Sequence, residues 1–262
     1  KHGKGTLRQP DGSTYNGEFA VGQRHGAGHA RFADGSVFEG EWRGGARDGV
    51  GNMYFGELAG GQNDMYGGHW RAGKWHGHGV YSYSSGASFE GEHEAGARHG
   101  PGRLTLRSGV VLSAQWERGT VSGEGTITYP DASRFAAPMV PAAASDAPEL
   151  SVQACGGSCT FEWPGGSSYA GGFARRASAA SDACLEYEPG GAGTMTTASG
   201  ATLHGSFAQG RLQGDGTGSY PDGEEYKGQF ADGVRSGQGT CHYADGAVYQ
   251  GHWAGDARQG RG

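Results

Sequence analysis

The sequence is poor in long apolar runs, in lysine and in cysteine. Its longest apolar stretch, Phe135–Ala144, is only ten residues long and is broken by two prolines. A membrane-spanning helix needs about 20 mostly apolar residues. The sequence therefore predicts no transmembrane helix.

Lysine is scarce and the overall charge is acidic. The formal net charge is −6. A nucleic-acid-binding protein needs a basic patch, and an anionic membrane surface is recognised by clusters of roughly 4–8 Lys or Arg residues. The sequence therefore excludes nucleic acid as a partner and does not favour lipid. The only lysines are Lys1, Lys4, Lys74 and Lys227.

The four cysteines are too few and too irregularly spaced for a disulfide scaffold, which indicates a reducing, intracellular setting. They are Cys155, Cys159, Cys184 and Cys241. Cys155 and Cys159 have a spacing that occurs in metal sites, but no neighbouring Cys or His pair completes a ligand set. No metal or cofactor is predicted there.

Glycine and aromatic residues are abundant, with 55 Gly, 12 Tyr, 10 Phe and 6 Trp in 262 residues. So much aromatic surface argues against a disordered chain. An aromatic-x-Gly-x-aromatic pattern recurs with a predominant spacing of 23 residues, interrupted by one short and two longer insertions. Each repeat is numbered from the first residue of this pattern, which is its position 1. The repeats start at Tyr15, Phe38, Tyr66, Phe89, Leu112, Phe135, Tyr169, Leu203, Tyr226 and Tyr249.

Each repeat is predicted to form a β-hairpin. The first strand places position 1 (aromatic), position 3 (Gly) and position 5 (aromatic) on one face, because side chains alternate along a strand. A turn follows around position 8, usually Gly, and the second strand is expected to begin at the Gly-x-Gly of positions 12 to 14. Asp-Gly pairs then predict tight turns with positive φ between one repeat and the next. The fold class predicted is all-β, an extended repeat array of antiparallel β-hairpins forming one continuous twisted sheet.

The glycines fit this array because an aromatic ring can lie flat over a glycine of an adjoining strand. The ring then covers exposed backbone and becomes buried without a second sheet. Each aromatic side chain buries up to roughly 150–250 Å². Stacked hairpins therefore stabilise a chain whose core is otherwise thin.

The pattern Tyr-x-Gly-x-Phe/Trp followed by His/Asp-Gly-x-Gly resembles the MORN repeat (membrane occupation and recognition nexus). Good matches begin at Tyr15 (YNGEFAVGQRHGAG), Tyr66 (YGGHWRAGKWHGHG) and Tyr226 (YKGQFADGVRSGQG). The resemblance extends over essentially the whole chain. It implies a non-enzymatic scaffold in a cytoskeletal or ciliary assembly of the axonemal or spoke-head type, and a cytoplasmic location. The family's name implies the alternative, a membrane-apposition module for anionic phospholipids.

Three segments are expected along the chain: MORN-like repeats over 1–134, two diverged repeats with inserts over 135–202, and MORN-like repeats over 203–262. Because the first and last repeats are partial, the sequence is expected to be cut from a longer array. The two inserts, Ala136–Ala154 and Ala174–Pro189, can be placed in equivalent turns. They are expected to lie side by side at one edge of the sheet, as a partner-specific feature or as tolerated loop growth.

The candidate partner-binding site is the aromatic-rich face, where side chains at position 5 should point the same way. A partner segment, from another protein or another copy of the chain, is expected to lie there. Ser178 follows Arg175-Arg176-Ala177 and is a candidate phosphorylation site. The residues assigned to the aromatic face are Trp42, Trp70, Phe89, Trp116 and Trp253.

Histidine recurs at position 11, which raises the question of a metal ladder. Successive copies lie two strands, ~9.5 Å, apart, whereas zinc ligands lie about 2.0–2.3 Å from one ion. A histidine bonded to the backbone beside a turn is the better interpretation. Since no nucleophile motif or nucleotide-binding loop occurs either, no enzyme is predicted. The histidines are His2, His25, His76 and His99.

Overall fold

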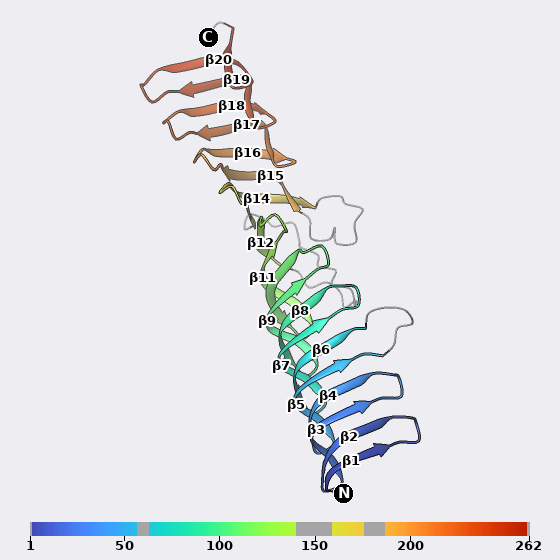
Figure 1. Cartoon of the computed structure of the whole chain (residues 1–262). Coiled ribbons are helices and arrows are strands. Elements are labelled where there is room, and N and C mark those ends of the chain that lie inside the picture. The colour runs from blue at the N-terminus through green and yellow to red at the C-terminus, as the bar shows by residue number, and fades with distance from the viewer. Residues whose placement is uncertain (1, 57–62, 140–158, 176–186, 261–262) are drawn as a thin grey trace. The chain divides into compact units, whose positions relative to one another are not determined.

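A computed structural model describes residues 2–56, 63–139, 159–175 and 187–260. These residues form 21 β-strands, all in one antiparallel sheet, and no helix (Figure 1). The predicted all-β array of hairpins is therefore confirmed. The chain divides into two compact units, Lys1–Ser122 and Gly123–Gly262. The sequence-based segments 1–134, 135–202 and 203–262 remain a prediction about repeat divergence.

In the first unit each strand pairs antiparallel with the next, from β1 to β10. The strands are β1 (Gly3–Arg8), β2 (Thr14–Ala20), β3 (Gln23–Arg31), β4 (Val37–Arg43), β5 (Ala46–Tyr54), β6 (Met65–Arg71), β7 (Lys74–Ser82), β8 (Ser88–Glu94), β9 (Ala97–Thr105) and β10 (Val111–Glu117).

The second unit follows the same rule from β11 to β21. The strands are β11 (Thr120–Thr128, which starts just before the unit), β12 (Arg134–Pro138), β13 (Cys159–Glu162), β14 (Ser168–Arg175), β15 (Tyr187–Thr196), β16 (Thr202–Ala208), β17 (Arg211–Ser219), β18 (Glu225–Ala231), β19 (Val234–His242), β20 (Val248–Ala254) and β21 (Ala257–Gln259).

Two kinds of turn alternate along the array. Val21 and Gly22 join β2 to β3 with φ of 50° and 78°, the positive pair that a two-residue type I′ hairpin requires. Between repeats, the Phe32 N–H donates to Ser36 O at 2.8 Å and the Asp34 carboxylate accepts from the Ser36 N–H at 2.9 Å. In this second turn only the glycine of the Asp-Gly pair has positive φ.

The second strand of a repeat does not begin at the Gly-x-Gly, so that expectation was wrong. Strand β3 begins at Gln23, directly after the turn, and pairs with β2 from there. The register then shifts: Glu18 opposes His25, whereas Gly17 opposes Gly28. The first glycine of the motif, Gly26, lies in this bulge with φ of 56°. The motif therefore marks a β-bulge inside the strand, where glycine tolerates the left-handed backbone.

The second glycine of the motif lies beneath the ring at position 1. A Cβ added to Gly28 would lie 2.6 Å from Tyr15 Cζ, and one added to Gly79 would lie 2.6 Å from Tyr66 Cζ. The Tyr15 hydroxyl also donates to Glu18 O at 2.9 Å. Only glycine lets the ring approach the backbone this closely, which confirms the predicted packing of aromatic rings over glycines.

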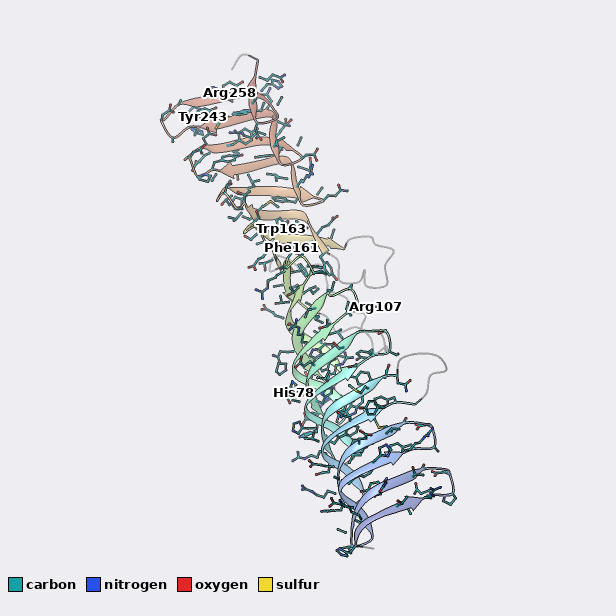
Figure 2. The ribbon with its side chains drawn as sticks, viewed as in Figure 1. His78, Arg107, Phe161, Trp163, Tyr243 and Arg258 are labelled. Atoms are coloured by element: carbon teal, nitrogen blue, oxygen red, sulfur yellow. The ribbon has the colours of Figure 1, made fainter. Side chains whose placement is uncertain are left out.

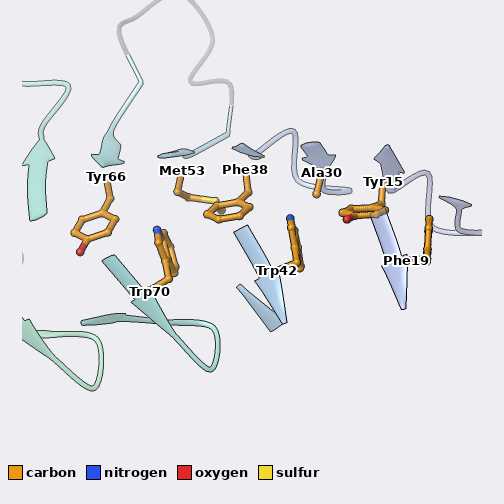
Figure 3. Packing of buried hydrophobic residues seen from close by; sticks show 8 residues of the cluster. All are labelled: Tyr15, Phe19, Ala30, Phe38, Trp42, Met53, Tyr66 and Trp70. Atoms are coloured by element: carbon orange, nitrogen blue, oxygen red, sulfur yellow. The ribbon is translucent and has the colours of Figure 1, made fainter. Parts of the chain in front are cut away.

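The core of the first unit is a series of edge-to-face ring contacts between positions 1 and 5, both within a repeat and between successive repeats (Figure 3). Phe38 lies 5.2 Å from both Trp42 and Trp70, and Tyr66 lies 5.2 Å from Trp70. Such pairs contribute about 0.5–1.5 kcal/mol each beyond the area they bury. Tyr15 continues the series, 5.3 Å from Trp42.

The second unit repeats this packing, with phenylalanine at position 5 in several repeats. Tyr169 contacts Phe173 at 5.2 Å and Phe207 at 4.8 Å. Further along, Tyr226 contacts Phe230 at 5.1 Å and Trp253 at 5.2 Å. Each repeat thus depends on its neighbour to bury its rings, as in other repeat proteins.

Candidate interaction face

The five rings assigned to the partner-binding face are buried by the chain itself. Their exposed fractions lie between 0% and 5%. They form the core, so partner contact at this face remains a prediction that concerns the residues around the rings. The five are Trp42, Trp70, Phe89, Trp116 and Trp253.

Three of the four tryptophans at position 5, Trp42, Trp70 and Trp253, also donate a hydrogen bond to the preceding repeat. The Trp70 indole N–H donates to Gly51 O at 3.0 Å, and the Trp253 N–H donates to Gly239 O at 3.2 Å. Both acceptors belong to the glycine at position 14 of the repeat before. The ring therefore fixes the register between repeats as well as filling space.

An arginine at position 10 is the residue that the sequence analysis missed. The Arg24 guanidinium carbon lies 4.1 Å from the centre of the Trp42 ring, and Arg47 lies 4.4 Å from Trp70. In each case the arginine belongs to one repeat and the tryptophan to the next. A cation–π contact of this kind contributes about 0.5–2 kcal/mol, more as the pair loses water.

The same stacking recurs wherever the next repeat carries tryptophan: Arg98 lies 4.7 Å from Trp116, and Arg235 lies 4.6 Å from Trp253. Where position 5 of the next repeat is another residue, position 10 is not arginine. Such pairs include Trp75 with His93, Val121 with Met139, and Leu212 with Phe230. The sequence itself contains this signal, because arginine at position 10 of one repeat accompanies tryptophan at position 5 of the next.

A ring at position 18 of the preceding repeat lies beside each of several arginines. Arg235 lies 5.1 Å from the Tyr220 ring, and Arg98 lies 5.7 Å from Tyr83, to whose hydroxyl it also donates a hydrogen bond. Near the end of the second unit Arg258 lies 5.7 Å from Tyr243 (Figure 2). Unlike the core rings, those at position 18 remain partly exposed.

We call the arginines at position 10 and the rings at position 18 the arginine–aromatic face of each unit. Neighbouring rings extend it: Phe161 lies beside Trp163, at 4.7 Å (Figure 2). Tyr81 lies 4.5 Å from Tyr83. The face consists of Arg24, Arg47, Arg98, Arg235 and Arg258 with Phe32, Phe55, Tyr83, Tyr129, Trp163, Tyr220 and Tyr243.

A pocket opens on this face beside Arg24. Its volume is about 220 Å³, and its lining includes Gln9, Ala30 and Phe32. In the partial repeat before Arg24, position 18 is the glutamine Gln9 rather than an aromatic residue. In the repeat that contains Arg24, position 16 is the small residue Ala30. The missing side-chain volume leaves the Arg24 guanidinium beside open space.

The opposite face of the sheet is polar. His29 Nε2 lies 3.5 Å from Glu39 Oε1, and His78 Nε2 lies 3.8 Å from Glu90 Oε1. His78 is labelled on this side of the ribbon in Figure 2. Exposed ion pairs of this kind contribute little to stability. The two faces of the sheet therefore differ in character, and the side with partly exposed rings is the stronger candidate for partner contact.

The histidines at position 11 have varied partners. His2 Nε2 accepts a hydrogen bond from the Val21 N–H at 3.3 Å, as expected beside a turn. His99 instead lies 3.4 Å from Glu94 Oε2, and His76 contacts Arg71. Within the described part of the chain, no group of three or more His, Cys, Asp or Glu side chains could hold a metal ion.

The cysteines differ from one another. Cys159 is disulfide-bonded, so its sulfur is not a thiolate ligand, and Cys241 is a free, buried thiol. A disulfide is more typical of an oxidising compartment than of the reducing setting that the cysteine count indicated. Cys155, Ser178 and most of both inserts lie outside the described residues. The phosphorylation site and the insert bump therefore stay predictions.

No helix among the residues that the structure describes could cross a lipid bilayer.

The periodic chemistry of these repeats matches a known family. The MORN repeat pattern is found at residues 1–14, 15–37, 38–57, 66–88, 89–111, 113–134, 226–248 and 249–262. The chain belongs to the MORN-repeat family. The unmatched residues 135–225 of this MORN-repeat protein include the diverged repeats identified from the sequence.

Among solved structures, this MORN-repeat protein is similar to the TCP10 domain of Danio rerio CPAP in complex with a peptide of Danio rerio STIL. Identity is 11%, the match covers 95% of this chain and 94% of that one, and the TM-score is 0.42. It is also similar to the Drosophila melanogaster SAS-4 (dCPAP) TCP domain in complex with a proline-rich motif of Ana2. There the identity is 11%, the coverage 87% and 90%, and the TM-score 0.36. No curated protein matches the sequence.

Proposed function

We propose that this MORN-repeat protein is a non-enzymatic scaffold that binds a segment of another protein along its arginine–aromatic face. The observation that supports this most directly is the row of partly exposed rings and arginines on one face, over a core that the repeats bury for themselves. Aromatic and arginine side chains are the residue types most often found at the centres of protein interfaces. A fold built by repetition also presents a long, regular surface.

The setting we propose is a cytoskeletal assembly of the cytoplasm, such as a ciliary or flagellar axoneme. This part of the proposal rests on membership of the MORN-repeat family, through the settings that the sequence resemblance implied. A second copy of the chain is a further partner to be tested, because a repeated surface can also contact itself.

Binding of anionic phospholipid is the alternative function. It would require a dense basic patch, and the four lysines of the sequence are widely separated. Association with phosphoinositide vesicles should therefore be weak and lost at physiological salt. Tight, lipid-selective vesicle binding at that salt concentration would favour the alternative.

The test is isolation of the full-length protein with its partners from its native cell, using two matched tyrosine variants. Tyr83→Ala alters the arginine–aromatic face. Tyr54→Ala alters the other side of the sheet, because Tyr54 neighbours the inward-facing Phe55, and Tyr54 is 37% exposed. We expect the partner to be lost with Tyr83→Ala and kept with Tyr54→Ala.

A third variant lacks residues 140–154 of the insert and keeps strand β12 (Arg134–Pro138) and the buried Met139. If this deletion alone eliminates the partner while Tyr83→Ala retains it, the face that we propose is not the binding surface.

A further inference from the structure

Three arginines of the first unit carry charges that the described part of the chain does not neutralise. Arg24, Arg47 and Arg98 are all partly buried, and no described carboxylate lies within 4.0 Å of any of them. Burial lowers the pKa of Arg47, and the charge of Arg24 lowers it further. Positive charge held in partly buried sites without a counter-ion is unfavourable until an anion arrives.

The second unit shows how the same position looks when the charge is neutralised. Arg235 Nη1 lies 3.0 Å from Glu224 Oε2, and Arg235 Nε lies 3.2 Å from Asp256 Oδ1. Glu224 stands eleven residues before Arg235. Eleven residues before the three arginines of the first unit the sequence has Ser13, Ser36 and Ala87 instead.

The hydrogen-bonding capacity of these guanidinium groups is only partly used. Arg24 Nη2 donates to Gly45 O at 2.7 Å, and Arg47 Nη2 donates to Gly73 O at 2.9 Å. A guanidinium has five N–H donors in a planar fork that suits a carboxylate. Because Arg24 also lines the open pocket, its remaining donors are within reach of a ligand.

Spacing indicates what kind of ligand would fit. Equivalent residues of adjacent repeats lie two strands, ~9.5 Å, apart. A polyproline II segment advances about 9.3 Å in three residues, so every third side chain faces the same way at almost the same spacing. Along four successive repeats position 10 reads Arg24, Arg47, Trp75 and Arg98.

We propose that the arginine–aromatic face of the first unit binds an extended, proline-rich acidic segment of a partner protein. Every third side chain of the segment faces one of the four residues at position 10. The first, second and fourth of these side chains are carboxylates that pair with Arg24, Arg47 and Arg98, and the third is apolar and contacts Trp75. This inference rests on the proposed scaffold function and adds the chemistry of the partner. Proline-rich segments commonly dock against aromatic rings, which here are Phe32 and Tyr83.

A flat membrane is a poorer match to the same arginines. Arg24 and Arg47 stack on core tryptophans and are partly buried, so a ligand must insert a narrow anionic group between rings. A carboxylate on an extended peptide can do this, whereas lipid headgroups held in a bilayer plane cannot follow the recess.

The test is fluorescence polarisation with a labelled ten-residue peptide and the full chain. The peptide carries Glu at residues 1, 4 and 10, Phe at residue 7 and Pro elsewhere. We expect Arg24→Gln, Arg47→Gln and Arg98→Gln each to weaken binding roughly tenfold or more, because hydrogen bonds to charged groups contribute about 1.5–3 kcal/mol. A peptide with Gln in place of Glu should bind no variant measurably.

Two further variants separate charge from folding. Ala87→Glu places a carboxylate beside Arg98 as Glu224 stands beside Arg235, and should weaken peptide binding to a similar degree without removing an arginine. Arg235→Gln is the matched control in the second unit and should leave binding unchanged.

Several results would overturn the inference: no binding of the acidic peptide, equal binding by all variants, or equal binding of the Gln peptide. Binding of phosphoinositide vesicles instead, lost in the arginine variants, would assign these residues to a membrane. Partner proteins retained in the isolation experiment by the arginine variants would refute this inference while leaving the scaffold function standing.

Discussion

Truncation of Trp70 to alanine should be among the most damaging single changes in the first unit. The ring is 5% exposed, lies 5.2 Å from both Phe38 and Tyr66, and is covered by Arg47 at 4.4 Å. Its N–H bond to Gly51 O is lost as well. Replacing a core Trp by Ala costs about 3–5 kcal/mol, because transfer and cavity effects add.

The effect should be local, because each repeat contacts only its neighbours. Long repeat arrays need not unfold in one step, so native-state hydrogen exchange followed by mass spectrometry is the appropriate assay. A loss of about 3–5 kcal/mol corresponds to exchange faster by roughly 100- to 4000-fold in β4 to β7. Strands β16 to β20 should be unaffected.

Val50→Ala is the matched control. Val50 neighbours the ring-covered Gly51 in the same strand, points to the opposite face and is 51% exposed. It should change stability by less than about 0.5 kcal/mol, as surface changes do. A similarly small change for Trp70→Ala would refute the account of a core built from rings between repeats.

Three other perturbations probe separate parts of the account. Gly51→Ala should cost about 1–3 kcal/mol in chemical denaturation, because the new Cβ would lie 2.7 Å from Phe38 Cε2, and a neutral result would contradict the packing of rings over glycine. A double-mutant cycle on Arg47 and Trp70 should give a coupling of about 0.5–2 kcal/mol, and no coupling would make the stacking incidental. Burial lowers the pKa of His93 from 6.5 to about 4, so its neutral form stabilises the fold above pH 6.5 and that contribution is lost as the pH falls towards 4. Relative to His93→Phe, the wild type should lose about 2 kcal/mol between pH 7 and pH 5, measured by hydrogen exchange, and an identical pH dependence would show that His93 is not buried neutral.

The repeat period and the strand pairing could be predicted from sequence because they depend on local rules. Alternation along a strand placed Tyr15, Gly17 and Phe19 on one face, and the glycine at position 8 predicted the hairpin turn. The start of the second strand could not be predicted. A glycine before a strand and a glycine in a bulge have the same local signature, and only the register of Gly17 with Gly28 distinguishes them.

Burial of the aromatic face was also beyond the sequence pattern. Alternation shows that Trp42 and Trp70 share a face, but not that rings and an arginine from neighbouring repeats cover them. The sequence signal for this coverage was the recurrence of arginine at position 10. It indicates burial only when each position 10 is compared with position 5 of the next repeat, where tryptophan accompanies arginine. Arg235 and Glu224 illustrate the same limit, since eleven residues separate them and strand alternation does not indicate that their side chains meet.

The measurement that tests the central claim most directly is photo-crosslinking in the native cell. A photo-reactive phenylalanine analogue at Tyr83 samples the arginine–aromatic face, and the same analogue at Tyr54 samples the opposite face. Our account predicts that the Tyr83 position crosslinks to one acidic, proline-rich segment of another protein and that the Tyr54 position does not. Crosslinks to that partner from Tyr54 alone, or equally from both positions, would contradict it.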